Sequence, residues 1–349
     1  MTSRAVGQDP GTMFFQVAEK NEAGEIELKE IRNAFVELDA APDIEQALSQ
    51  NDWQYVSDGK KHYVIGEDSM RVARMFPGKV ELRRPMQDGI LNKEEDKKML
   101  VMAYMIESSI GKAPDNDSVV CTCVSSEAVD TTIDNTFHKA RLEGMFKRLG
   151  WNVKVIEEGH AIILSERPIL IEKDGSESPY SGIGISFGAG KVNCVLAYKG
   201  LPVIGLSATR SGDWIDKKVS EQTDIPIAQV TNIKETQLDF EKIDYENDVI
   251  FALDAYYTSM IEYVFKNFAI KFSKVKSQFE VPLDIVIAGG TSTPKGFGKK
   301  VEQTISKLDL PFQIKDIRIS KDPRNSVVKG LLTQAIITQK RLLADKEKE

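Results

Sequence analysis

The 349-residue sequence has few of the residues that build disulfide frameworks or zinc sites. Its three cysteines, Cys121, Cys123 and Cys194, are too few and too unevenly spaced for a disulfide framework, which predicts a reducing, cytoplasmic setting. Cys121 and Cys123 share one face of a predicted strand, where we expect them to be buried as small hydrophobic side chains. The three histidines are scattered along the chain, so a zinc site is not expected.

The sequence also lacks long apolar runs and an excess of positive charge. No stretch approaches about 20 apolar residues, so no membrane-spanning helix is expected. Residues 1–12 lack the apolar segment of a signal peptide. The net charge of −7 argues against direct nucleic-acid binding as the main role. The length is sufficient for two domains, each with its own core.

What the sequence does contain is a glycine turn between a buried strand and a helix start. Within residues 283–297, the apolar run at 285–288 predicts a buried strand, and Gly289 and Gly290 predict a turn that needs positive φ. A helix is expected to begin at Thr291. Unpaired backbone N–H groups point outward at such a helix start, and glycines let a ligand approach closely. The stretch is therefore a candidate cradle for phosphate.

Two glycine-containing hairpins, about 180 residues apart, repeat one pattern. The first contains Asp9 and residues 11–13, and the second spans residues 186–191 between two apolar strands. Asp9 could present a carboxylate to a hydrated metal ion while the N–H groups of residues 11–13 face a phosphate. From its own residues alone, the first hairpin is better explained as an ordinary turn. Together the two hairpins predict an internal duplication that could clamp a triphosphate from both sides.

The segments between these motifs alternate between predicted strands and helices. Methionines in the first long helix and aromatic residues in the helix at 248–272 have the spacing of core-facing side chains. A buried strand ends in Glu157 and Glu158, which could deliver a carboxylate to a cleft. Residues 340–349 are expected to form a charged, solvated tail. Helices are predicted at 93–111, 130–149, 248–272, 296–308 and from 322 onward, and strands at 118–124, 153–156, 182–195 and 312–317.

Taken in order, these residues resemble the actin, sugar kinase and heat-shock chaperone ATPase superfamily. Within it they are most similar to bacterial and archaeal actin-like proteins of the MreB, MamK and ParM kind. Residues 9–12 resemble the first phosphate loop, 186–193 the second, and 283–297 the adenosine motif. Residues 84–89 resemble the segment that re-enters the first large domain in MreB and MamK, and 322–330 resemble the closing helix.

The resemblance implies an α/β actin-like fold with two duplicated ribonuclease-H-like lobes around a nucleotide cleft, each lobe carrying a small insert. The second insert is reduced in this chain. The implied division is a first large subdomain at 1–30 plus 84–178, with the helix 322–349 packing back on it, a small α/β insert at 31–83, a second large subdomain at 179–321, and a reduced insert near 217–246.

The resemblance also implies a set of site residues for ATP or GTP and Mg²⁺. Asp9 would hold the hydrated Mg²⁺, and Glu158 would position the attacking water, so these two are the candidate catalytic residues. The remaining implied contacts are with the nucleotide. They are Gly11, Thr12, Met13, Ser186, Gly188, Ala189, Gly190, Lys191, Gly212, Asp213, Lys234, Glu235, Gly289, Gly290 and Thr291.

Two positions in the second loop depart from the family pattern. Ser186 stands where the family usually has Asp, and Lys191 stands where it usually has Thr. Loss of a carboxylate near the metal should weaken metal binding. Lys191 either neutralises phosphate charge or is a hairpin-turn lysine directed at water. Hydrolysis is therefore expected to be slow, or absent while nucleotide binding persists.

The leading hypothesis is an ATP-dependent actin-like protein that forms head-to-tail homopolymers as a cytoskeletal filament, with an adaptor or cargo protein as a further partner. The alternative is a non-hydrolysing scaffold of the FtsA or PilM kind that binds nucleotide without turnover. A small-molecule kinase is a third class. That class needs a substrate-binding Asp as general base in the cleft, and no convincing candidate is present.

Overall fold

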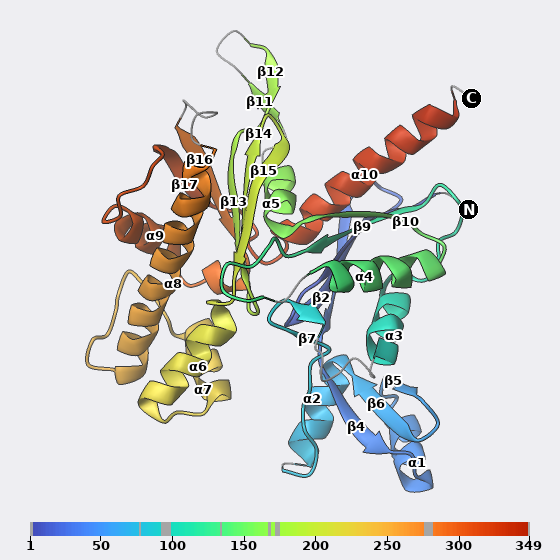
Figure 1. Cartoon of the computed structure of the whole chain (residues 1–349). Helices are drawn as coiled ribbons and strands as arrows, with labels where there is room; N and C mark the ends of the chain where they lie inside the picture. The colour runs from blue at the N-terminus through green and yellow to red at the C-terminus, as the bar shows by residue number, and fades with distance from the viewer. Residues whose placement is uncertain are drawn as a thin grey trace. The chain divides into compact units, whose positions relative to one another are not determined.

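The chain forms two compact units, each built around a five-stranded sheet (Figure 1). The computed structural model describes residues 3–76, 78–91, 99–132, 135–166, 169–171, 175–275 and 282–347. Unit 1 comprises Met1–Cys123, Thr136–Val155 and Leu331–Glu349, and unit 2 comprises Val124–Asn135 and Ile156–Gly330. No helix in the described part of the chain has the length and apolar character needed to cross a bilayer.

The sheet of unit 1 has the strand order β10-β9-β1-β2-β3. Strand β1 is antiparallel to β2 and parallel to β9, and β2 is antiparallel to β3. The first predicted hairpin is therefore the β1–β2 connection. The strands are β1 (Ala5–Pro10), β2 (Phe14–Lys20), β3 (Ile26–Arg32), β9 (Val119–Val124) and β10 (Asn152–Glu157).

The segment predicted as a small α/β insert at 31–83 forms a three-stranded sheet with two helices and a core of its own. The strand order is β4-β6-β5, and an isolated bridge between Phe35 and Arg83 closes the segment. Val36, Leu48 and Val64 are in its core. The elements are β4 (Phe35–Asp39), α1 (Pro42–Gln50), β5 (Tyr55–Ser57), β6 (Lys61–Ile65) and α2 (Gly66–Met75), and a two-stranded hairpin of β7 (Met86–Gln87) and β8 (Ile90–Leu91) follows.

Three helices complete unit 1: α3 (Met99–Ile110), α4 (Thr136–Arg148) and the end of α10 (Ser326–Lys346). Met102 and Met105 of α3 are buried, which confirms the prediction that they are core residues. The predicted start of α3 at 93 lies outside the described residues, and α4 begins at Thr136 rather than at 130. The C-terminal residues are exposed as predicted, but they are helical through Lys346.

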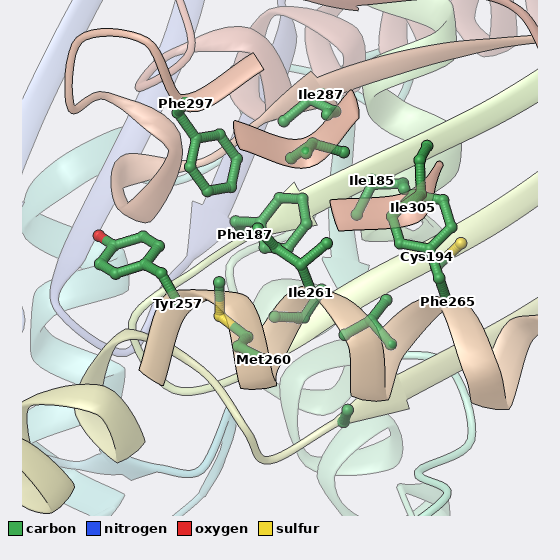
Figure 2. Close-up of a cluster of buried hydrophobic side chains, with 14 of the residues drawn as sticks. Ile185, Phe187, Cys194, Tyr257, Met260, Ile261, Phe265, Ile287, Phe297 and Ile305 are labelled. Carbon is green, nitrogen blue, oxygen red and sulfur yellow. The ribbon is translucent and has the colours of Figure 1, made fainter. Parts of the chain in front are cut away.

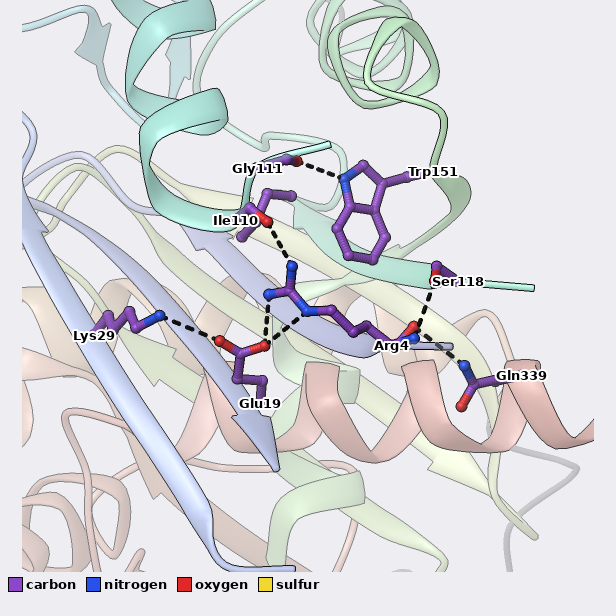
Figure 3. Close-up of polar contacts among 8 residues, drawn as sticks. All are labelled: Arg4, Glu19, Lys29, Ile110, Gly111, Ser118, Trp151 and Gln339. Carbon is purple, nitrogen blue, oxygen red and sulfur yellow. Dashed lines mark hydrogen bonds and ion pairs between the residues drawn. The ribbon is translucent and has the colours of Figure 1, made fainter. Parts of the chain in front are cut away.

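Arg4 ties several of these elements together within unit 1 (Figure 3). Its Nε donates to Glu19 Oε2 at 3.1 Å and its Nη1 donates to the carbonyl of Ile110 at 2.8 Å. The guanidinium also lies over the ring of Trp151, 5.3 Å from its centre. Gln339 of α10 donates to the Arg4 carbonyl at 3.1 Å. The half-buried Arg4 side chain therefore connects the start of β1 to β2, α3 and the segment before β10. The backbone carbonyl of Arg4 binds α10.

Unit 2 repeats the sheet of unit 1, which confirms the predicted duplication. Its order is β15-β14-β13-β16-β17, with β13 antiparallel to β14 and parallel to β16. The second predicted hairpin is the β13–β14 connection, the counterpart of β1–β2. The strands are β13 (Gly182–Phe187), β14 (Val192–Tyr198), β15 (Leu201–Ala208), β16 (Leu283–Ala288) and β17 (Ile314–Ile319).

The long helix α8 (Asp248–Ser273) packs its aromatic stripe against one face of this sheet (Figure 2). Tyr257 and Phe265 of the helix lie in one buried cluster with Ile185 and Phe187 of β13 and Cys194 of β14. Every second residue of these strands therefore faces α8. The residues between them in β13, which are Gly182, Gly184 and Ser186, face the other side of the sheet. The prediction that the aromatic stripe is core packing is confirmed.

On that other face, helix α5 (Glu158–Glu166) lies unusually close to the sheet. A Cβ on Gly159 would sit 2.8 Å from the Gly184 carbonyl and 2.9 Å from the Val195 nitrogen. A Cβ on Gly330 of α10 would overlap the backbone of Ala161 in α5. The contacts of α5 with β13 and β14 group it with unit 2, whereas the sequence division placed residues 84–178 with the first subdomain.

The rest of unit 2 consists of short elements around the sheet. The predicted reduced insert at 217–246 contains the end of α6 (Gly212–Thr223), all of α7 (Ile227–Thr236) and non-helical turns after residue 236, with no strand in the described part of the chain. A two-stranded hairpin follows α5. The other elements are α9 (Phe297–Ile305), β11 (Ile169–Ile171) and β12 (Glu177–Pro179).

Gly330→Ala should destabilise the protein by about 3 kcal/mol or more, because the added methyl group meets helix backbone that cannot move independently. Gly144→Ala is the matched control, since Gly144 also lies inside a helix but has no atom within 4 Å of the added Cβ. It should leave the free energy of unfolding unchanged or raise it by up to about 1 kcal/mol. Urea unfolding checks both, and equal effects of the two variants would contradict the close packing of α5 and α10.

Candidate functional site

Three sequence-distant segments of unit 2 meet at the backbone carbonyl of Gly188. This oxygen accepts a hydrogen bond from the Gly212 N–H at 3.1 Å and one from Thr291 Oγ1 at 2.9 Å. The Asp213 N–H donates to the neighbouring Ala189 carbonyl at 2.9 Å. The second predicted phosphate loop, the start of α6 and the predicted adenosine motif are therefore fixed to one another.

Glycine is required at this junction because backbone approaches backbone. A Cβ on Gly289 would overlap the Phe187 backbone, and its φ of +97° is unfavourable for residues with a side chain. A Cβ on Gly212 would overlap Thr291 Oγ1. By contrast, a Cβ on Gly290 would meet no atom within 4 Å, so this residue faces open space. Gly290 is thus the point at which this junction leaves room for a ligand.

The helix predicted to start at Thr291 is not there. A 3₁₀ turn spans Gly290–Ser292, and α9 begins only at Phe297, after Gly296 has adopted a left-handed conformation with φ +78°. Thr291 is drawn inward, since its hydroxyl bonds the Gly188 carbonyl and its own carbonyl accepts from Tyr257 Oη at 3.1 Å. The prediction of a helix start was therefore wrong, although the glycine turn was correct.

Ser186 and Glu158 come together through Asn193. Ser186 of β13 and Asn193 of β14 are directly opposed across the antiparallel pair, and both are almost fully buried. Asn193 Nδ2 donates to Glu158 Oε2 at 2.7 Å, and Glu158 is the first residue of α5. The sequence prediction did not single out Asn193, although an amide opposite the altered Ser186 was a signal that could have found it.

Lys191 and Gly190 complete the turn of the second loop. The Gly188 N–H donates to the Lys191 carbonyl at 3.0 Å, which closes the turn over Ala189 and Gly190. The Lys191 side chain is only 3% exposed. The alternative in which Lys191 points into bulk water is therefore wrong, and a buried cation lies in the loop predicted to hold phosphate.

Lys234 forms a buried ion pair within unit 2 that the sequence did not predict. Its Nζ lies 2.7 Å from Asp216 Oδ1 and donates to the Gly212 carbonyl at 3.1 Å, while Thr231 Oγ1 donates to Asp216 Oδ2 at 2.7 Å. Both members of the ion pair are buried. Lys234 thus supports the start of α6, and the exposed side chain of the predicted pair is Glu235.

The predicted residues of unit 1 lie at the β1–β2 turn. Asn33 Nδ2 donates to the Gly11 carbonyl at 2.8 Å, and the Asn33 N–H donates to the Met13 carbonyl at 3.0 Å, so Asn33 fixes the turn from outside. A Cβ on Gly11 would sit 2.7 Å from the Phe14 carbonyl. Thr12 is buried. The loop is therefore rigidly built, and Asn33 is a supporting residue that sequence reasoning missed.

Asp9 is a half-buried residue at the end of β1. Burial raises its pKa from the ordinary 3.8 to about 6, while a hydrogen bond from Cys123 Sγ at 3.3 Å acts in the opposite direction. Cys121 and Cys123 are buried as predicted, and Cys123 has this additional contact. The contact depends on the parallel register of β1 and β9, which pairs Gly7 with Cys121.

The donor set around Asp9 fits a metal held mainly through water and phosphate. The described residues contain no group of three or more His, Cys, Asp or Glu side chains that could cage a metal ion. Mg²⁺ commonly binds through one or two carboxylates, waters and substrate phosphates. A desolvated carboxyl such as Asp9 would also be stabilised in its charged form by a nearby cation.

Comparison with known proteins identifies the family. The Volactin family model matches residues 4–335, nearly the whole chain. The chain belongs to the Volactin family. No curated protein sequence matches this Volactin-family chain.

Solved structures show that the chain has an actin-like fold. A structure described as a MamK double helical filament matches with a TM-score of 0.66 at 17% identity, covering 96% of this chain and 99% of that one. MreB5 of Spiroplasma citri bound to ADP matches with a TM-score of 0.64 at 14% identity, covering 98% of each chain. The same protein bound to AMPPNP gives 0.66 at 15% identity, covering 100% and 99%. The expected resemblance and fold class are confirmed.

Asp9→Asn should make the ligand-free Volactin-family protein more stable than the wild type above about pH 6. Because the folded-state pKa is raised, folding favours the protonated carboxyl, whose contribution is fully present below about pH 4 and is lost as pH rises through about 6. The gain should reach about 2 to 3 kcal/mol at pH 8 and vanish below pH 4. Urea unfolding across pH checks this.

Asp43→Asn serves as the control, because Asp43 is an exposed residue of α1 in the same unit. It should not produce a stability gain that grows with pH. If wild type and Asp9→Asn give parallel curves of stability against pH, Asp9 is not desolvated in the folded protein.

Proposed function

We propose that this chain binds ATP and assembles into cytoskeletal filaments, with slow Mg²⁺-dependent hydrolysis of the nucleotide. The observation that carries the proposal is the junction at the Gly188 carbonyl, where the second phosphate loop, the start of α6 and the adenosine motif are tied together. Phosphate binding requires backbone N–H groups held in fixed positions with room for the ligand. The glycines packed against neighbouring backbone fix the loops in position, and Gly290 leaves room for a ligand.

In this proposal the residues keep the roles that the resemblance implies, with one change. Residues 11–13 and 188–191 bind phosphate groups of ATP, with GTP as the alternative nucleotide. Because the Lys234 ammonium is paired with Asp216, the exposed Glu235 is the better candidate to contact the ribose. The buried ammonium of Lys191 contributes positive charge to the phosphate loop.

Hydrolysis would depend on two carboxyl groups. Asp9 holds the water shell of Mg²⁺, which supplies neutralisation of phosphate charge when bound. Glu158 accepts a hydrogen bond from the attacking water and so orients it. Ser186 offers no carboxylate, so charge neutralisation around the metal is incomplete and turnover is slow.

The proposed partner is a second copy of the chain, joined head to tail. A heterologous contact of this kind generates an open polymer rather than a closed ring when the repeat does not close. The similar fold solved as a MamK double helical filament supports this assignment, and the ADP and AMPPNP complexes of MreB5 support nucleotide binding. The filament would lie in the cytoplasm, with an adaptor or cargo protein as a further partner.

The second candidate function is a scaffold that binds nucleotide without turnover. The observation that favours it is Ser186, a neutral and almost fully buried side chain at the position where the family pattern has Asp. Both candidates require nucleotide binding and differ in phosphate release and assembly.

Right-angle light scattering of the purified protein after addition of Mg-ATP, with phosphate release followed in parallel, tests the proposed function. We expect scattering to rise above a critical protein concentration and phosphate to be released slowly, at a rate that falls when EDTA removes the metal. A stable rise without phosphate release would identify a filament that lacks turnover. Nucleotide binding with no rise at any concentration would favour the scaffold, and failure to bind nucleotide would reject both.

A further inference from the structure

A row of buried polar side chains crosses the sheet of unit 2 beside Glu158. Cross-strand pairing places Ser186 of β13 opposite Asn193 of β14, and Asn193 opposite Ser207 of β15. Directly paired residues project on the same face of a sheet. All three side chains are at most 1% exposed. The row therefore lies on the face that α5 covers.

Asn193 has a fixed amide orientation in this row. Its Nδ2 donates to Glu158 Oε2 at 2.7 Å, and a carboxylate accepts hydrogen bonds but does not donate them. The amide oxygen Oδ1 consequently points elsewhere, and it accepts no hydrogen bond from the described residues. A buried acceptor without a donor costs about 1 to 3 kcal/mol. A donor outside the chain, such as a bound water molecule, would satisfy this acceptor.

Glu158 is held at both its main chain and its side chain. Gly159 brings the first turn of α5 against the Gly184 carbonyl, so the backbone of Glu158 has a fixed height above the sheet. The Asn193 amide then selects the direction of the carboxylate.

We propose that Asn193 is the positioning residue for Glu158, and that its Oδ1 is a second acceptor for the attacking water. The proposal rests on the proposed nucleotide hydrolysis. The attacking water would donate one hydrogen bond to Glu158 and the other to Asn193 Oδ1. These two fixed acceptors would set its orientation and so direct its lone pair toward the γ-phosphorus.

The step then balances with groups already named. The water oxygen bonds to the γ-phosphorus, and the bond from that phosphorus to the β-phosphate oxygen breaks. One proton of the water passes to Glu158 and from there to the released phosphate. Asn193 neither gains nor loses a proton, which is why it positions rather than catalyses.

Asn193→Ala should lower kcat for ATP hydrolysis about 10- to 100-fold and change KM by less than about 3-fold. Asn193→Asp should lower kcat further, although it preserves the shape of the side chain, because it cannot donate and sets a second carboxylate against Glu158. Calorimetric titration with AMPPNP and Mg²⁺, which needs no turnover, should give affinities within about 3-fold of the wild type for Asn193→Ala.

Ser207→Ala is the matched control, since Ser207 is the next residue in the same buried row but its hydroxyl bonds the Ser126 carbonyl at 2.8 Å. It should leave kcat within about 2-fold of the wild type.

Two results would overturn the inference: wild-type kcat in Asn193→Ala, or an equal loss in Ser207→Ala. Wild type that binds AMPPNP but releases no phosphate would also overturn it. Wild type that fails to bind AMPPNP would instead reject the proposed function, on which the inference depends.

Discussion

The hydrogen bonds to one backbone oxygen, the Gly188 carbonyl, fix the geometry on which the candidate site depends. This oxygen accepts from the Gly212 N–H and from Thr291 Oγ1, so loops from three parts of the sequence share one anchor. Tyr257 bonds the carbonyl of Thr291, and Lys234 bonds the carbonyl of Gly212. Two of the three loops are thus also held by a hydrogen bond from a buried side chain.

Close backbone packing supplies the second constraint. Gly159 against Gly184, and Gly330 against Ala161, allow α5 to approach both the sheet of unit 2 and α10 at distances that no side chain would permit. The position of α5, the helix that carries Glu158, therefore depends on the lack of a side chain at Gly159 and Gly330. A substitution at any of these glycines would displace the Glu158 carboxylate, although none of them is a candidate nucleotide-binding residue.

The sequence predicted those features that depend on local pattern. The two hairpins, the aromatic face of α8 and the glycine turn at Gly289 follow from periodicity and backbone preference, and the ordered motifs were enough to predict the actin-like fold. Features set by pairing between distant segments were missed. Cys123 donates a hydrogen bond to Asp9 because of the register of β9 against β1. Asp216 forms an ion pair with Lys234 because α6 packs beside α7.

The predicted helix start at Thr291 failed for a related reason. A threonine after a glycine turn is compatible with a helix start, but here its hydroxyl bonds a carbonyl more than 100 residues away, and the chain forms a 3₁₀ turn instead. Local preference could not reveal that partner. The same bond now defines the most direct test of the central claim, that the junction at Gly188 shapes a nucleotide site.

Calorimetric titration of Mg-ATP into wild type and Thr291→Val is that test, because valine keeps the shape of threonine and removes only the hydroxyl donor. Thr293→Val is the control in the same turn, since the exposed Thr293 hydroxyl bonds only the local Gly290 carbonyl. We expect at least about 10-fold weaker binding for Thr291→Val and a change below about 2-fold for Thr293→Val. Wild-type affinity in Thr291→Val would contradict the central claim.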